Sequence, residues 1–175
     1  TGLEFLSCIP GSIGGAIRMN SGCYGEDISK ILHSIKAIDI NGNEKNISAS
    51  DIKFSYRDSN FDQDLIITSV KIIGKISPRE EIYNKQQKLI EQKKKSQPSQ
   101  IKTCGSTFKN TENKKAWELI KESNCQNLNV GNAKISEKHC NFFVNEGKAT
   151  SKELEDLINK VKETVYQKTK INLEL

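Results

Sequence analysis

The sequence contains no apolar run close to the roughly 20 residues that a transmembrane helix requires, which excludes a helical membrane span. It has no basic and apolar leader at its start, and we expect neither a signal peptide nor membrane insertion. The five cysteines are scattered, and no two have Cys-x-x-Cys spacing. This pattern argues against a disulfide framework or a zinc site, so we expect no metal and a reducing, cytoplasmic location.

Arginine is scarce, since only Arg18, Arg57 and Arg79 stand among 27 basic residues. A guanidinium offers a planar set of donors that lysine lacks, so an arginine in this chain is a candidate for a specific role. The formal charge of +5 permits an anionic ligand without requiring nucleic acid. The lysines at 93–95 have no interleaved aromatic residues or glycines, and we interpret them as a solvated helix end rather than a nucleic-acid site.

The first part of the chain is rich in strand signals. Asn41-Gly42 predicts a hairpin within residues 34–48. The apolar run at 65–73 predicts a buried strand. Ser77-Pro78 then predicts the start of a helix that extends to about residue 95, with its apolar side formed by Ile82, Leu89 and Ile90.

The second part has the signals of a separate α+β unit. Residues 96–103 interrupt the long helix and are interpreted as a linker, which predicts domains at 1–97 and 98–175. A helix is expected at 113–123 and a strand at 140–144. Thr150 and Glu153 form a capping box before a helix of about 17 residues, whose apolar stripe consists of Leu154, Leu157, Ile158, Val161 and Val165.

Residues 9–16 form a glycine-rich turn. Gly11, Gly14 and Gly15 allow positive φ and close approach to a ligand, Ser12 adds a hydroxyl, and successive N–H groups can bind a phosphate. The spacing matches neither the Rossmann fingerprint nor the P-loop. A plain tight turn is the alternative.

Three further groups of polar residues are candidates. Arg57 can bind a carboxylate or stabilise negative charge, or it can simply pair with Asp58 at the surface. Ser106 follows a glycine without a G-x-S-x-G elbow, so a proton donor or relay is favoured over a serine nucleophile. Lys109 and Asn110 can meet a diphosphate or lie in a polar turn. His139 and Asn141 are better explained as groups that satisfy backbone near a strand.

These segments together resemble one family, the UDP-N-acetylenolpyruvoylglucosamine reductases, over essentially the whole chain. Each segment alone is a weak signal, but all of them occur in the same order in that family. They include Ile-Pro-Gly-Ser-Ile-Gly-Gly-Ala, Tyr-Arg-Asp-Ser and Gly-Ser-Thr-Phe-Lys-Asn, and lie at 2–16, 24–25, 54–59, 97–98, 105–110, 131–139 and 172–175.

The resemblance implies an α+β fold: part of a vanillyl-alcohol-oxidase-type FAD-binding domain, followed by a smaller α+β substrate-binding domain. It implies a cytoplasmic flavoprotein of peptidoglycan precursor synthesis. In that family NADPH reduces FAD, and the reduced flavin passes hydride to UDP-N-acetylglucosamine enolpyruvate, which gives UDP-N-acetylmuramate. The partner expected is the small-molecule UDP-sugar substrate, and no nucleic acid is expected.

The resemblance also assigns residues. Arg57 matches the arginine that stabilises charge on the substrate, and Ser106 matches the proton donor. Lys109 and Asn110 match positions that contact the substrate phosphates. Part of the flavin diphosphate site is matched by Pro10, Gly11, Ser12, Gly14 and Gly15.

Two elements of the family pattern are expected outside this sequence. A first glycine-rich FAD segment should precede Thr1, and the catalytic glutamate should follow Leu175, since Glu174 matches an earlier glutamate of the motif. Residues 171–175 also alternate like a strand without a tail. We therefore expect a fragment that is inactive alone and binds FAD weakly or not at all. The alternative is a non-catalytic nucleotide-binding module on the same fold.

Overall fold

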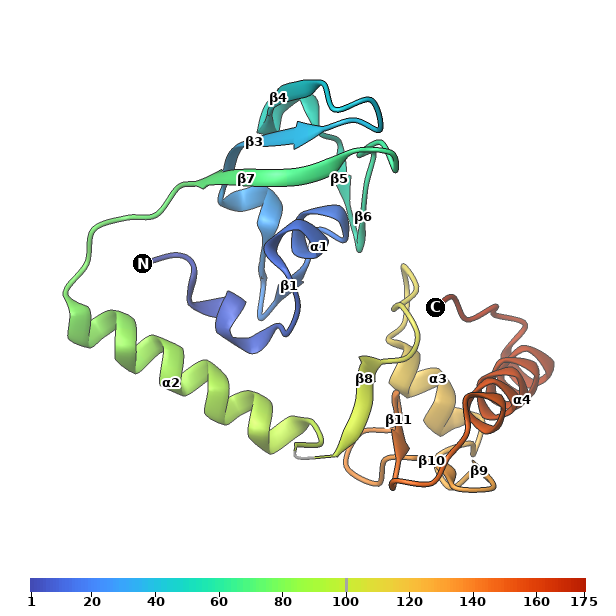
Figure 1. Cartoon of the computed structure of the whole chain (residues 1–175). Coiled ribbons are helices and arrows are strands. Elements are labelled where there is room, and N and C mark those ends of the chain that lie inside the picture. Colours follow the sequence, from blue (N-terminus) through green and yellow to red (C-terminus); the bar gives the residue numbers. More distant parts are fainter. Residues whose placement is uncertain (100) are drawn as a thin grey trace. The chain divides into compact units, whose positions relative to one another are not determined.

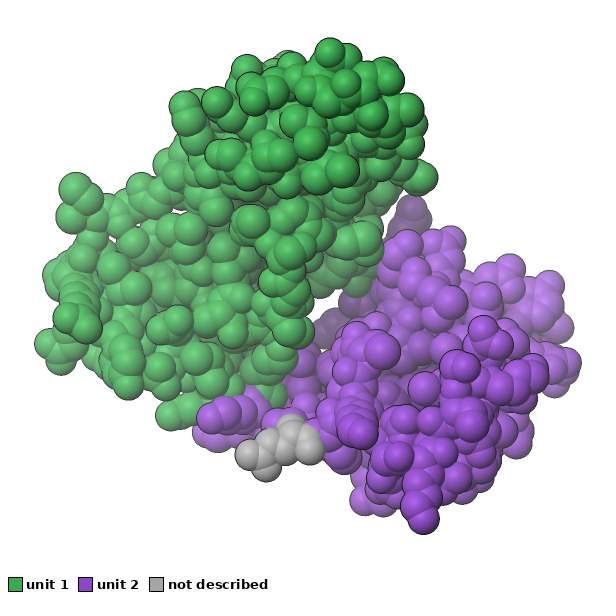
Figure 2. Space-filling model, in the orientation of Figure 1, with its two compact units in different colours: residues 1–93 green, residues 94–175 purple. Residues whose placement is uncertain are grey.

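The computed structural model describes residues 1–99 and 101–175, which divide into two compact units (Figures 1 and 2). Unit 1 is Thr1–Lys93 and unit 2 is Lys94–Leu175. The division lies a few residues before the expected boundary at 97/98, and Gln100, in the expected linker, lies outside the described residues. No helix in the described part of the chain is long and apolar enough to cross a membrane.

The main sheet of unit 1 has three antiparallel strands in the order β4 (Glu44–Ser48), β3 (Leu32–Ile38) and β7 (Ile66–Ile72). Strands β3 and β4 form the hairpin that Asn-Gly predicted. Its loop, residues 39–43, is longer than a two-residue turn. Within it the Asp39 carboxylate accepts the N–H groups of Asn41 and Asn43 at 2.9 and 3.0 Å. An acidic side chain thus organises this turn.

The expectation that 65–73 is a buried strand is wrong in its burial. Strand β7 is an edge strand, and its residues alternate in exposure. Leu65 is buried and Ile67 and Val70 pack against the core of the unit, whereas Ile66 is 62% exposed. A run of apolar residues does not reveal whether one face or both faces of a strand are covered.

Shorter elements complete the core beneath this sheet. The buried side chains come from the start of the chain, from helix α1 (Ile13–Arg18), from the 3₁₀ helix η2 (Ile28–Lys30) and from β3, and include Phe5, Ile17, Ile28, Ile35 and Ala37. The short elements are the 3₁₀ helices η1 (Glu4–Cys8), η2 (Ile28–Lys30) and η3 (Ala49–Asp51), helix α1 (Ile13–Arg18), and the ribbons β1 (Gly22–Cys23) with β2 (Glu26–Asp27) and β5 (Phe54–Ser55) with β6 (Asp58–Ser59).

Helix α2 (Arg79–Ser96) confirms the long helix predicted after the strands. It begins at Arg79, directly after Pro78. The Ser77 hydroxyl donates to the Glu81 carboxylate at 2.8 Å. Ile82, Leu89 and Ile90 are half-buried, and Leu89 packs against the core of unit 1. The helix therefore has the apolar side that its sequence predicted.

Unit 2 contains a four-stranded antiparallel sheet. Its order is β8 (Lys102–Ser106), β11 (Phe142–Asn145), β10 (Ala133–Ile135) and β9 (Asn129–Val130). The expected strand at 140–144 begins two residues late, because the N–H of Phe142 first closes a turn on the carbonyl of His139. The unit is α+β, as the sequence predicted.

Helices α3 (Ala116–Glu122) and α4 (Ser151–Thr169) pack with the sheet around one core (Figure 1). The predicted capping box is confirmed: the Thr150 hydroxyl accepts the N–H of Glu153, whose carboxylate accepts the N–H of Thr150 at 2.7 Å. The predicted stripe is confirmed too, with fully buried side chains at Leu157, Val161 and Val165. Helix α3 is shorter than expected, because residues 111–114 close a turn before it.

The turn between β9 and β10 meets the start of α4. Gly131 has a φ of +54°, and a Cβ there would lie 1.6 Å from Oε1 of Glu153. The same carboxylate accepts the N–H of Asn132 at 3.3 Å. A side chain at position 131 would therefore displace the carboxylate that caps α4.

The strand expected at 171–175 is not formed. Leu173 is buried in the core of unit 2, and the segment is tied to the unit by a bond from the N–H of Lys109 to the carbonyl of Glu174 at 2.8 Å. One such bond does not make a ladder. The alternating pattern therefore does not correspond to strand pairing, and Leu175, in phase with Leu173, is 62% exposed.

Glu4 ties the first residues of unit 1 to α2. Its side chain is buried, and its carboxylate accepts the N–H of Gly2 at 2.8 Å and lies 3.3 Å from Nζ of Lys85. Burial by itself raises the pKa of Glu4, but hydrogen bonds from Thr1, the backbone and Lys85 outweigh it and lower the pKa to about 2.

We expect acid to destabilise unit 1 through Glu4. Because its pKa is lowered from 4.5 to about 2 on folding, the ionised carboxylate stabilises the unit at neutral pH, and this contribution is lost as the pH falls between those values. Such a shift corresponds to at most roughly 3 kcal/mol. Glu4→Gln should remove this pH dependence from amide hydrogen exchange in unit 1. Tryptophan fluorescence would miss it, since Trp117 lies in unit 2.

Glu26→Gln is the matched control, because Glu26 forms only a half-exposed pair with Lys30 at 3.6 Å. Exposed pairs of this kind contribute about 0–1 kcal/mol. The exchange is followed from about pH 5 to about pH 2, the interval in which Glu4 titrates. Identical exchange profiles for wild type and Glu4→Gln over this interval would contradict the assigned role of Glu4.

Candidate functional site

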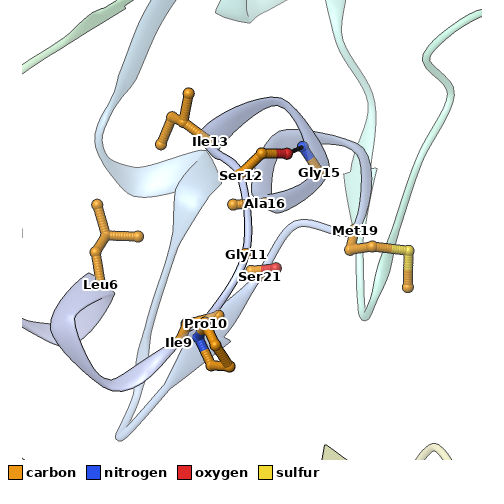
Figure 3. A pocket seen from close by; sticks show the side chains of 10 residues that line it. All are labelled: Leu6, Ile9, Pro10, Gly11, Ser12, Ile13, Gly15, Ala16, Met19 and Ser21. Atoms are coloured by element: carbon orange, nitrogen blue, oxygen red, sulfur yellow. Dashed lines mark hydrogen bonds between the residues drawn. The ribbon is translucent and has the colours of Figure 1, made fainter. Parts of the chain in front are cut away.

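The glycine-rich turn leads directly into α1 (Figure 3). Ser12 is the N-cap, and its hydroxyl accepts the N–H of Gly15 at 3.1 Å. Gly11 has a φ of +134°, which requires glycine, whereas Gly14 and Gly15 are helical. The expectation of positive φ at Gly14 and Gly15 is thus wrong, because these residues form the first turn of α1, where Gly14 faces Ile67.

A cavity of about 360 Å³ lies at this turn. Its walls combine the turn with apolar side chains, and no lining residue is charged; they are Leu6, Ile9, Pro10, Gly11, Ser12, Ile13, Gly15, Ala16, Met19 and Ser21. Apart from the Gly15 N–H, which the Ser12 hydroxyl accepts, the first N–H groups of α1 have no partner within the helix and are available to a ligand. Four of the five predicted flavin-contacting residues line the cavity; Gly14 does not.

Arg57 lies in the two-residue connection between β5 and β6 and has a φ of +56°. A positive φ is uncommon for a residue with a long side chain and is often found at functional sites. Its guanidinium donates to the carbonyl of Gly22 at 2.7 Å and to that of Asn20 at 3.4 Å, and lies over the ring of Tyr56. Among the described residues Arg57 forms no ion pair with Asp58, so the surface-pair interpretation is wrong.

A second cavity, of about 500 Å³, lies beside Arg57. Its two acidic residues have other partners, since Glu26 pairs with Lys30 and Asp27 accepts a hydrogen bond from Ser29. Burial, first, and the neighbouring Cys8 raise the pKa of the Cys23 thiol to about 11, so this thiol is uncharged at neutral pH. The lining residues are Asn20, Gly22, Cys23, Gly25, Glu26, Asp27, Ser29, Phe54, Ser55, Tyr56 and Arg57.

Ser106 ends strand β8 in unit 2, where it lies opposite Phe142. Its side chain is exposed, and among the described residues no group hydrogen-bonds to its hydroxyl. The backbone of this residue is therefore fixed by the sheet while its Oγ stays accessible. A hydroxyl held in this way can donate a proton to a ligand or relay one.

Asn141 holds the loop that follows Ser106. The Asn141 side chain is 3% exposed, accepts the N–H of Phe108 at 3.0 Å and donates to the carbonyl of Phe108 at 2.8 Å. His139 accepts the N–H of Asn141 at 3.2 Å, and burial lowers the pKa of this imidazole. The interpretation that these two side chains satisfy backbone groups is confirmed.

Lys109 and Asn110 lie in the same loop. The amide oxygen of Asn110 accepts the N–H of Ala116 at 3.0 Å and so caps the first turn of α3. The backbone of Lys109 is fixed by the carbonyl of Glu174. This loop thus has a structural basis of its own, and the contact of either side chain with a substrate phosphate stays a prediction.

The structure gathers the predicted residues into two groups. Residues 10–15 and Arg57 belong to unit 1, and Ser106, Lys109 and Asn110 belong to unit 2. All five cysteines are free, and the described residues include no group of three His, Cys, Asp or Glu side chains that could hold a metal. Asn20 also lines the cavity beside Arg57, and its only signal in the sequence is that asparagine tolerates positive φ.

Comparison with known proteins gives one consistent result. Residues 97–175 match the family model described as UDP-N-acetylenolpyruvoylglucosamine reductase, C-terminal domain. Among curated proteins, the UDP-N-acetylenolpyruvoylglucosamine reductase of Pelagibacter ubique is 46% identical over 176 residues, which cover 99% of this chain and 58% of that protein. The reductase of Wolbachia sp. subsp. Drosophila simulans is 45% identical over 175 residues, 99% of this chain and 59% of that protein.

A solved structure matches both units. The crystal structure of the reductase from Thermus caldophilus has a TM-score of 0.87 and 32% identity, over 99% of this chain and 62% of that chain. This chain therefore spans about three fifths of the length of these relatives. Over 99% of its length the chain is thus similar in sequence and fold to UDP-N-acetylenolpyruvoylglucosamine reductases, and its residues 97–175 match the C-terminal domain of that family.

Proposed function

We propose that this chain is part of an enzyme that reduces UDP-N-acetylglucosamine enolpyruvate to UDP-N-acetylmuramate, a step of peptidoglycan precursor synthesis. The observation that carries the proposal is Arg57, held at positive φ with its guanidinium fixed beside a cavity. The similarity to the reductases suggests the reaction, and this geometry gives the chain a residue suited to it. Unit 1 would be one part of a vanillyl-alcohol-oxidase-type flavin-binding domain, and unit 2 the substrate-binding domain.

The turn at residues 10–15 fits a flavin diphosphate. Its cavity has no acidic side chain to repel an anion, and Gly11 lets the backbone turn sharply toward a ligand. Pro10, Gly11, Ser12 and Gly15 would contact the cofactor directly, and Gly14 would keep the first turn of α1 close to β7. FAD, reduced by NADPH, would supply the hydride for the reaction.

The residues of this chain would stabilise charge and supply the proton. Arg57 would stabilise the negative charge that spreads into the substrate carboxylate as hydride reaches C3 of the enolpyruvyl group. A guanidinium has five N–H groups, and Arg57 uses two of them on carbonyls, which leaves three for the substrate. Ser106 would donate the proton to C2, and Lys109 and Asn110 would contact the substrate phosphates.

The proposal is tested on the protein at the full length of its relatives. We expect the purified protein to show visible flavin absorbance and to oxidise NADPH only when UDP-N-acetylglucosamine enolpyruvate is added. Flavin absorbance without substrate-dependent NADPH oxidation would support the alternative of a non-catalytic nucleotide-binding module. A colourless protein that gains no absorbance when FAD is added would contradict the proposal.

A further inference from the structure

We propose that Asn20 is a positioning residue for Arg57. Asn20 holds both the β5–β6 ribbon and the guanidinium of Arg57 in the arrangement that reaction with the substrate requires. This inference rests on the proposed function of Arg57. Asn20 follows α1, so it also connects the glycine-rich turn to the arginine through one short stretch of chain.

The side chain of Asn20 joins two segments that are distant in sequence. It is 7% exposed, and its amide nitrogen donates to the carbonyl of Ser55 at 3.0 Å. Its amide oxygen accepts the N–H of Ser29, at the 3₁₀ helix η2, also at 3.0 Å. Ser55 is the last residue of β5 and lies two positions before Arg57, so the amide fixes one side of the turn that bears the arginine.

The backbone of Asn20 makes the second connection. Its carbonyl accepts Nη1 of Arg57 at 3.4 Å, beside the Gly22 carbonyl that accepts Nη2 at 2.7 Å. Asn20 itself has a φ of +39°, a region that asparagine tolerates better than other residues with side chains. The direction of the carbonyl toward Arg57 thus depends on the backbone conformation that Asn20 adopts.

These contacts make Asn20 more than a filler of space. Arg57 is held at a positive φ that an isolated ribbon would not favour, and such conformations persist only where the surroundings fix them. The side chain of Asn20 is hydrogen-bonded to Ser55, on the strand that leads into the turn, and the carbonyl of Asn20 is hydrogen-bonded to the guanidinium of Arg57. Loss of the amide should therefore allow the guanidinium to move relative to the cavity while leaving its charge unchanged.

The test uses the full-length flavoenzyme with Asn20→Asp. This variant keeps the shape of the side chain and an oxygen for the N–H of Ser29, but sets a second oxygen against the carbonyl of Ser55. We expect reoxidation of reduced flavin by the enolpyruvyl substrate to slow by about tenfold or more, because small displacements at a reacting centre have large effects. Flavin reduction by NADPH should stay within about twofold of wild type, because the role proposed for Arg57 belongs to the second half-reaction.

Asn60→Asp is the matched control. Asn60 closes the other end of the same ribbon, where its amide oxygen accepts the N–H of Lys53 at 2.7 Å, an acceptor that aspartate keeps. It should leave both half-reactions unchanged. If Asn20→Asp does not fold, Asn20→Gly keeps the positive φ and removes only the side-chain bonds, and the same difference between half-reactions is expected.

A double-mutant cycle with Arg57→Lys separates positioning from general structural damage. If Asn20 acts through Arg57, Asn20→Asp should slow reoxidation by less than about threefold once Arg57 is already lysine. The inference would be overturned if the rate effects of the two substitutions simply multiply in the double variant. It would also be overturned if Asn20→Asp slows both half-reactions equally, or if its reoxidation rate stays within about twofold of wild type.

One readout does not depend on activity. The Nε–H resonance of Arg57 in a nitrogen-15 spectrum, identified by its loss in Arg57→Lys, should move in Asn20→Asp and stay in place in Asn60→Asp. If Arg57→Lys itself leaves reoxidation nearly unchanged, the proposed function fails, and this resonance alone decides whether Asn20 positions Arg57. An unmoved resonance would then contradict the inference.

Discussion

On the proposed function, Arg57→Lys in the full-length protein should slow the reoxidation of reduced flavin by the enolpyruvyl substrate about 30- to 1,000-fold. This range corresponds to roughly 2–4 kcal/mol of barrier, comparable to the loss of one oxyanion donor. The guanidinium contacts the carbonyls of Gly22 and Asn20 and keeps further N–H groups for a ligand. The ammonium of a lysine cannot keep these contacts and at the same time form two parallel hydrogen bonds to a carboxylate.

Arg18→Lys is the control for this substitution. The Arg18 guanidinium also donates to backbone carbonyls, those of Asp62 and Gln63, and lies over the ring of Phe61 at 4.9 Å. It does not line the cavity beside Arg57. Arg18→Lys should therefore affect stability rather than the hydride step. Single-turnover reoxidation by Arg57→Lys within about threefold of wild type would contradict the catalytic role, since that is under 1 kcal/mol.

Ser106→Ala should slow only the second half-reaction, by about 10²- to 10⁴-fold, as is typical when a general acid is lost. The side chain of Ser106 is exposed and its backbone is fixed by β11 and by the loop that Asn141 holds. The substitution thus removes the hydroxyl without disturbing the strand. Stopped-flow measurement of flavin reduction by NADPH and of reoxidation by substrate separates the two steps.

Ser151→Ala provides the comparison, because Ser151 is an exposed serine of the same unit at the start of α4. It should change neither step. If Ser106→Ala slows flavin reduction as much as reoxidation, Ser106 organises the site and does not donate the proton. A change that appears only in the substrate concentration needed for half-maximal rate would likewise argue against proton donation.

Features encoded by neighbouring residues could be predicted from the sequence. The capping box of Thr150 and Glu153 and the stripe of α4 are set by positions three and four residues apart, and the structure has both. Asn41-Gly42 marked its hairpin because turn residues act within a few positions. The turn at Gly11 and Ser12 was predicted for the same reason, since a short motif forms one turn, whereas its assignment to a flavin diphosphate depends on the resemblance to the reductases.

Features that depend on distant partners could not be predicted. The exposure of Ile66 follows from the position of β7 at the edge of its sheet. Residues 171–175 form no strand, because none of the described strands pairs with them. The sequence singled out Arg57 by the rarity of arginine, but its anchoring requires the carbonyls of Asn20 and Gly22, more than 30 residues away. No local pattern encodes such a contact.

The carboxylate of Glu153 gives unit 2 a particular pattern of opening. Because Gly131 leaves room for it, one side chain caps α4 and accepts the N–H of Asn132 in the β9–β10 turn. Fraying of the first turn of α4 withdraws the acceptor from the turn, and rearrangement of the turn withdraws the cap from the helix. The start of the helix and the sheet edge are thus expected to exchange their amide hydrogens as one cooperative segment, with a shared opening free energy.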